Sequence, residues 1–220
     1  MKPKHPVSAF RTAWVGALAI FLASCGQRDV PLSQFNKIGD FQLIDSTGRV
    51  VSNADVKGRI LVVDFFFGSC SAQCLTLSQR MEELQRLTAG TRDLMLLSIT
   101  VDPRTDTPEA LQRYAGRHNA DTNRWLFLTG DRSVIYPFIQ QSFLLTVAAD
   151  NDLGAPFGGG FIHSTKIALV DKRGVVRAYY EGMDGSAPQQ ILSGIEQLRK
   201  EPPSDSQAQP VSETTNRTPL

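Results

Sequence analysis

The stretch VVDFFFGSCSAQCLTLSQRM, residues 62–81, decides the fold of this chain. A nearly continuous apolar run, typical of a strand buried on both faces, leads into two cysteines four residues apart. From the second cysteine onward, apolar residues recur at helical spacing. These residues are Cys74, Leu77, Met81, Leu84 and Leu87. The stretch therefore predicts a buried strand, a turn and an amphipathic helix. Its two cysteines could form a disulfide, bind a metal or be ordinary buried thiols.

Strand-like runs and helical patterns alternate on both sides of this stretch. Thr107 can cap a helix that has Pro108 at its first position, and Pro137 disturbs a later helix. The expected elements are a β-hairpin over 41–52, a strand over 59–67, a helix from 74, a strand over 93–102, a helix over 107–118, a strand over 124–131, a helix over 132–145, a β-hairpin over 164–182 turning at 172–174, and a helix over 187–200. This order predicts an α/β domain with a thioredoxin-like fold, in which helices flank a central mixed sheet and a β-hairpin comes first.

The first 24 residues are expected to be an export signal. A basic start precedes Ala13–Ala23, an apolar run of eleven residues that is too short to span a bilayer. The run ends in LASC, residues 22–25, which resembles the bacterial lipoprotein signal. A plain secretory cleavage site is the alternative. The lipoprotein interpretation predicts an acylated Cys25 and a domain outside the cytoplasm, on the periplasmic side of the bacterial cell envelope.

The chain is therefore expected to divide into four parts. These are a lipoprotein signal peptide over 1–24, a lipidated tether over 25–38, a thioredoxin-like domain over 39–200 and a disordered tail over 201–220. Loss of three basic residues with the signal lowers the formal net charge from +1 to −2. A mildly acidic chain of this kind gives no indication of nucleic-acid binding. Acylation of Cys25 would leave only Cys70 and Cys74 free to pair, in a compartment where disulfides form.

One of the three histidines, His163, is placed to join the cysteines. His5 leaves with the signal, and His118 ends a helix that it is expected to cap. His163 follows a loop with four glycines and precedes a strand. If that strand is antiparallel to the one that ends at Phe67, its start lies beside Cys70. From spacing alone, a metal ligand and a loop histidine that donates a hydrogen bond are equally compatible with this position.

Two thiolates and an imidazole together favour copper. Soft sulfur ligands suit Cu(I), and an added imidazole suits Cu(II). A tetrahedral zinc site would need a fourth ligand, and the sequence offers no further well-placed cysteine or histidine. A regular helix would hold the Cβ atoms of residues four apart at about 5–6 Å, beyond the roughly 3.5–4.5 Å of a disulfide. A disulfide therefore requires Cys70 to lie in the loop before the helix. Asp102 lies at the same sheet edge, where a turn residue before Pro103 is expected and a role beside the metal is the alternative.

These motifs resemble the Sco/SenC family of membrane-anchored copper-binding proteins with a thioredoxin-like fold. The resemblance rests on CSAQC at 70–74, SITVDPRTDTPEAL at 98–111 and HSTKIALVDKRGVV at 163–176. It implies copper ligation by Cys70, Cys74 and His163. It also implies a role in assembling the binuclear copper centre of cytochrome c oxidase. The implied partners are the copper-binding subunit of the oxidase, a copper donor protein and, through the lipid, a membrane.

The chain departs from the family motif at two positions. The motif is typically C-P-x-x-C-P, and Ser71 and Leu75 stand where it has prolines. Serine keeps its N–H and leaves φ free, so copper affinity and redox potential are left open. The sequence favours a copper metallochaperone. The alternative is an enzyme, a thiol-disulfide oxidoreductase whose Cys70 and Cys74 keep a partner's copper-ligating cysteines reduced. A peroxiredoxin-like peroxidase is disfavoured, because Phe67 stands where the resemblance would require threonine.

Overall fold

The computed structural model describes residues 31–70, 73–149, 161–162 and 164–201. The expected signal peptide, Cys25, His163 and most of the expected tail lie outside the described residues. Within the part of the chain that is described, no helix is both long enough and apolar enough to cross a membrane.

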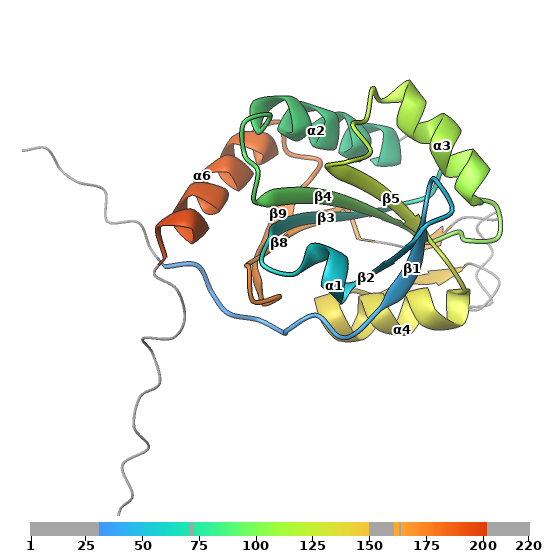
Figure 1. Cartoon of the computed structure of the whole chain (residues 1–220), viewed down its shortest axis with the longest axis horizontal. Helices are drawn as coiled ribbons and strands as arrows, with labels where there is room; N and C mark the ends of the chain where they lie inside the picture. Colours follow the sequence, from blue (N-terminus) through green and yellow to red (C-terminus); the bar gives the residue numbers. More distant parts are fainter. Residues whose placement is uncertain (1–30, 71–72, 150–160, 163, 202–220) are drawn as a thin grey trace, which may run out of the picture. The chain divides into compact units, whose positions relative to one another are not determined.

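A seven-stranded mixed sheet forms the centre of the domain, in the order β2-β1-β5-β4-β3-β8-β9 (Figure 1). Strands β3, β4 and β5 are parallel, whereas β8 runs antiparallel to β3 and β9 antiparallel to β8. The strands are β1 (Gln42–Asp45), β2 (Val50–Ser52), β3 (Ile60–Phe66), β4 (Leu94–Thr100), β5 (Trp125–Thr129), β8 (Lys166–Val170) and β9 (Val176–Glu181), and β6 (Ala148–Ala149) pairs separately with β7 (Phe161–Ile162). The predicted α/β class, central mixed sheet and N-terminal hairpin are confirmed.

Helices cover both faces of this sheet (Figure 1). They are α1 (Asn53–Val56), α2 (Gln73–Leu87), α3 (Pro108–Arg117), α4 (Arg132–Phe143) and α6 (Ala187–Lys200). Helices α1 and α4 pack on one face, and α2, α3 and α6 pack on the other. Each face of the sheet has its own hydrophobic core, and alternate residues of β3 are buried in one or the other. Val63 and Phe65 lie in the core on the α4 side, and Val62 and Phe66 lie in the core on the α2 side. Burial on both faces explains why this strand is an almost unbroken apolar run.

Local signals account for several helix ends. The side chain of Thr107 accepts a hydrogen bond from the N–H of Ala110, Pro108 opens α3, and His118 is its C-cap, as predicted. Pro137 lies inside α4. The apolar stripe predicted for α2 is buried except at its last member, because Leu87 at the end of the helix is 40% exposed.

Residues before β1 extend the sheet edge along β9. The N–H of Phe35 donates to the carbonyl of Val176, and the N–H of Val176 donates to the carbonyl of Asn36, each at 2.9 Å. Ile38 is buried in the core on the α4 side. The sequence places residues 31–38 in the tether, whereas the structure shows this stretch packed against the domain.

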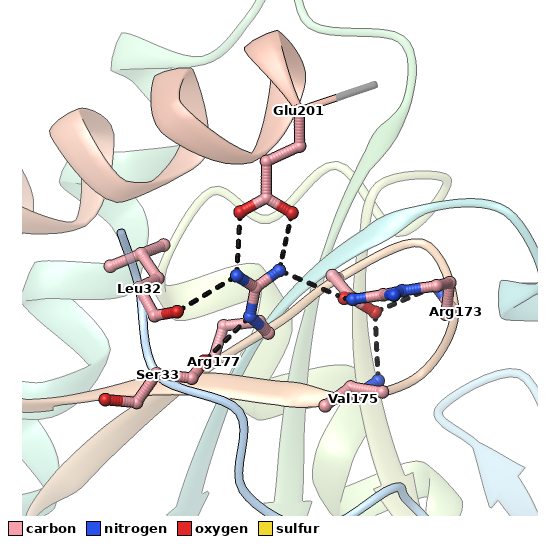
Figure 2. Close-up of polar contacts among 7 residues, drawn as sticks. Leu32, Ser33, Arg173, Val175, Arg177 and Glu201 are labelled. Carbon is pink, nitrogen blue, oxygen red and sulfur yellow. Dashed lines mark hydrogen bonds and ion pairs between the residues drawn. The ribbon is translucent and has the colours of Figure 1, made fainter. Parts of the chain in front are cut away.

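The side chain of Arg177, which is 3% exposed, ties this segment to the end of the last helix (Figure 2). Its guanidinium donates two hydrogen bonds of 2.7 Å to the carboxylate of Glu201 and one of 3.2 Å to Asp171. It also donates to the carbonyls of Leu32 at 3.1 Å and Ser33 at 2.7 Å. The first and last described segments of the chain are therefore held together through one buried arginine.

Candidate metal centre

The two cysteines lie where β3 gives way to α2. Cys70 is in a turn, and its N–H donates to the carbonyl of Phe67 at 3.2 Å. The N–H of Cys74 donates to the Sγ atom of Cys70 at 3.4 Å. The described part of α2 begins at Gln73, so Cys70 is in the loop before it and Cys74 is in its first turn. This placement meets the condition under which both a disulfide and a shared metal ion are reachable.

No disulfide joins Cys70 to Cys74 in this structure. Their joining on oxidation therefore stays a prediction. Cys70 is half-buried, whereas Cys74 is fully buried in the core beneath α2. Burial, reinforced by the neighbouring Cys70, raises the pKa of the Cys74 thiol. Metal binding by Cys74 must therefore release a proton from a thiol that holds it tightly, whereas Cys70 is the thiol that solvent and partners can reach.

A buried carboxylate, Asp106, holds the turn that carries Cys70. The N–H of Gly68 donates to both carboxylate oxygens of Asp106, at 2.9 and 3.2 Å, and the hydroxyl of Thr100 donates at 2.5 Å. Burial raises the pKa of Asp106. Asp102 is the predicted turn residue, since its carbonyl accepts hydrogen bonds from the N–H groups of Thr105 and Asp106. The sequence alone does not point to this role of Asp106, because its partner Gly68 is 38 residues away.

We expect Gly68→Ala to disturb this turn, because an added Cβ would lie 2.6 Å from Oδ1 of Asp106. Overpacking of this kind costs about 1–3 kcal/mol. Denaturant unfolding measures the loss, and the rate of Cys70 alkylation reports on the turn itself. Gly90→Ala is the matched control, because a Cβ there meets nothing within 4 Å. Equal stability of the two variants would show that Asp106 does not constrain the turn.

A second buried carboxyl, Asp64, projects from β3 on the side that faces α2. It is 0% exposed, and its Oδ1 accepts a hydrogen bond of 2.5 Å from Ser98, whose Oγ accepts one of 2.8 Å from the indole N–H of Trp125. Oδ2 has no hydrogen-bond partner among the described residues. Burial raises the pKa of Asp64 to about 7. Its charge in turn helps to raise the pKa of Cys74, so the carboxyl and the buried thiol are electrostatically coupled.

The histidines differ in how far the structure tests them. His118 is buried at the end of α3, with Nδ1 3.6 Å from Glu82 and its ring 4.8 Å from that of Tyr114, and burial lowers its pKa. His163 lies outside the described residues. Strand β8, which follows His163 in the sequence, is antiparallel to β3 as predicted. The start of β8 therefore lies beside the end of β3 that leads to Cys70. Among the described residues no three His, Cys, Asp or Glu side chains form a metal cluster, so the three-ligand site stays a prediction.

Comparison with known proteins identifies relatives of this chain. A model of the SCO1/SenC family matches residues 30–200. A SCO1/SenC family lipoprotein from Bacillus anthracis is 28% identical, with a TM-score of 0.70 over 78% of this chain and 100% of that one. BsSco, a member of the Sco family of cytochrome c oxidase assembly proteins in which a disulfide switch was identified, is 27% identical, with a TM-score of 0.67 over 79% of this chain and 100% of that one.

A more distant neighbour shows the same fold. ScoI of Bradyrhizobium japonicum, solved with copper bound, is 22% identical, with a TM-score of 0.61 over 73% of this chain and 98% of that one. With these neighbours, the predicted thioredoxin-like fold is confirmed.

Proposed function

The chain belongs to the SCO1/SenC family, and from this premise we propose that it is a membrane-anchored copper metallochaperone for the binuclear copper centre of cytochrome c oxidase. The observation that carries the proposal is the pair of thiols at the start of α2, one half-buried and one fully buried. Thiolates are the ligands that Cu(I) prefers. Copper-bound ScoI, which shares the fold, and BsSco, an oxidase assembly protein, support the assignment.

The two thiols would have different tasks. Cys74 is fixed in the core and offers a sulfur that does not move with the loop. Cys70 is more accessible, and its sulfur already accepts the N–H of Cys74, an interaction that stabilises negative charge on sulfur. Copper, as cargo, would bind to both sulfurs with release of their protons. Exchange with a thiolate of the oxidase subunit would begin at Cys70, since an incoming ligand can approach it.

We further propose that Cys25 is acylated and anchors the domain on the periplasmic side of the bacterial cell envelope. The LASC sequence supports this, and the neighbour from Bacillus anthracis is a lipoprotein. Anchoring would keep the copper site at the membrane surface that holds the oxidase. A copper donor protein would load the site there.

A thiol-disulfide oxidoreductase remains the second candidate. The reduced pair of Cys70, in the turn before α2, and Cys74, in its first turn, favours it, and BsSco, at 27% identity, contains a disulfide switch. An oxidoreductase would cycle between the reduced pair seen here and a Cys70–Cys74 disulfide, passing two electrons to a partner disulfide. Metal analysis of the mature protein purified reduced, with its thiol-disulfide potential, tests both candidates. A reduced protein that takes up no copper would contradict the chaperone.

The proposed third ligand leads to a specific prediction. His163→Ala should weaken Cu(II) binding by at least the roughly 10–100-fold that is lost when a residue that only supports a metal ligand is removed. It should weaken Cu(I) binding much less, because Cu(I) is satisfied by two thiolates. Wild-type protein with Cu(II) should show a visible sulfur-to-copper charge-transfer band. His163→Ala should lose or shift that band and keep its Cu(I) affinity in competition with a soft chelator.

His118→Asn is the matched control, because it removes an imidazole that the structure places at the end of α3 and keeps a polar residue at the cap. Its charge-transfer band should equal that of the wild type. An unchanged band in His163→Ala would mean that this histidine does not reach the metal, and the three-ligand site would have to be abandoned.

A further inference from the structure

Both ends of the described chain lie near the edge of the sheet that is formed by the start of β3. The cysteines lie at the opposite edge, where β3 ends. Cys70 follows the end of β3, whereas the turn between β8 and β9 lies beside the start of β3. The seven residues of β3, joined by six rises of about 3.3 Å, separate these two edges by about 20 Å. Leu32 and Glu201 both bind Arg177 near that turn (Figure 2). In Figure 1 the blue start of the described chain and the red end of α6 accordingly lie together on the left.

A cavity of about 330 Å³ opens at this edge. The segment before β1, helix α1, the start of β3 and the β8–β9 turn all contribute to its lining. Two acidic residues, Asp40 and Asp171, and five basic residues line it. We call the five basic residues the basic edge: Lys37, Lys57, Arg59, Lys172 and Arg173.

Ion pairs neutralise two members of the basic edge, because Arg173 binds Asp171 at 2.7 Å and Lys172 binds Asp93 at 2.6 Å. Asp171 also binds the buried Arg177. Lys37 and Lys57 are exposed and have no ion-pair partner among the described residues. Positive charge therefore collects on one edge of a chain whose formal net charge becomes −2 once its first 24 residues are removed. Such an edge attracts anions, above all closely spaced ones on a surface.

The length of the tether brings this edge close to a lipid surface. Only residues 26–30 separate the proposed acylated Cys25 from Pro31, the first described residue, so six Cα–Cα steps join the two. Six extended residues span at most about 20 Å. The segment that follows runs directly to Lys37 at the cavity. Anionic membranes attract clustered Lys and Arg side chains only within about a Debye length, so a short tether is what such an interaction requires.

We propose that the basic edge binds phosphate groups of anionic phospholipids in the membrane that holds the anchor. The domain then stands with the Cys70 edge pointing away from the bilayer, toward a protein partner. This inference rests on the proposed acylation of Cys25 and adds an orientation to it. The shared chemistry is recognition of phosphate, which a free phosphate ion would also offer, so the experiment separates these two sources.

The test uses the mature acylated protein in nanodiscs of phosphatidylcholine alone or mixed with phosphatidylglycerol. A trace of lipid carries a gadolinium chelate on its headgroup, and NMR measures how much faster each amide relaxes. We expect the amides of Lys57 and Lys172 to relax several-fold faster than that of Gly68 in the mixed discs, with a smaller difference in phosphatidylcholine. Lys37→Glu/Lys57→Glu should abolish the effect of lipid charge. Arg104→Glu/Arg113→Glu, with the same charge change in the loop after β4 and on α3, should preserve it.

Other outcomes would overturn the proposal. The basic edge would not respond to lipid charge if the relaxation profiles were identical in both lipids. The same would follow if the Lys37→Glu/Lys57→Glu variant kept the wild-type difference between them. Saturation of the same amides by micromolar inorganic phosphate, with no response to lipid charge, would assign the cavity to a soluble anion. The mass of the mature N-terminus tests the anchor separately. An unmodified Cys25 would overturn the anchor and this orientation together, whereas an acylated protein with equal profiles would overturn the orientation alone.

Discussion

Cys70→Ser should lower the affinity for Cu(I) by more than the roughly 10–100-fold that is lost when a residue that only supports a metal ligand is removed, because a hard hydroxyl replaces a soft thiolate. Cys70 is half-buried in a turn, so the substitution should leave the fold intact and affect the metal alone. Competition with a soft chelator under reducing conditions measures the affinity. Ser69→Ala is the matched control, because it changes an exposed neighbour in the same turn and should bind copper like the wild type.

Cys74→Ser should lose Cu(I) affinity as severely, since Cys70 and Cys74 are the two cysteines of the described residues and neither thiolate has a third to replace it. It also places a hydroxyl in the core beneath α2, so its unfolding free energy must be measured beside its affinity. If Cys70→Ser kept Cu(I) affinity within tenfold of the wild type, the two-thiol site would be wrong. The oxidoreductase would instead be supported if the wild type took up no copper but exchanged disulfides, and if both variants lost that exchange.

The main elements of the fold follow from local patterns. Strands β3 and β4 are buried throughout and largely apolar because helices cover both faces of a central sheet. Thr107 marks the start of α3 because its side chain accepts a hydrogen bond from a free N–H group of the first turn. Pro108 marks it because it has no N–H group that would need a partner there. Gly174 turns the β8–β9 hairpin at a φ of +80°, a conformation that glycine adopts without strain. Each of these features depends on neighbours in the sequence, which is why the sequence predicts them.

The surroundings of the cysteines depend on distant residues and could not be predicted in the same way. Asp106 reaches Gly68 across 38 residues, and Ser98 reaches Asp64 across 34. Arg177 joins Leu32 to Glu201. The spacing of Cys70 and Cys74 also left the start of α2 open, because a proline at position 71 would have marked the first turn and serine does not. The structure places Cys70 before the described helix.

Asp64 should make the protein less stable as the pH rises, and Asp64→Asn should remove this dependence. The carboxyl is fully buried with one oxygen lacking a hydrogen-bond partner among the described residues, so the folded state favours its protonated form. Its pKa is raised to about 7 from an ordinary 3.8. Because the folded pKa is the higher one, the stabilisation is complete below 3.8 and is lost as the pH rises through 7.

At about 1.4 kcal/mol for each pH unit between 3.8 and 7, the expected loss is about 4 kcal/mol, a large part of the stability of a domain. Asparagine keeps an oxygen that can accept from Ser98 but does not ionise, so whatever constant cost it carries is the same at every pH. Denaturant unfolding of reduced, metal-free wild type and Asp64→Asn from pH 4 to pH 8 measures the difference. We expect the variant to gain about 4 kcal/mol relative to the wild type across this range. A difference that stays constant with pH would mean that Asp64 is already ionised in the folded protein at pH 4, and that water or an unseen partner solvates it beneath Cys74.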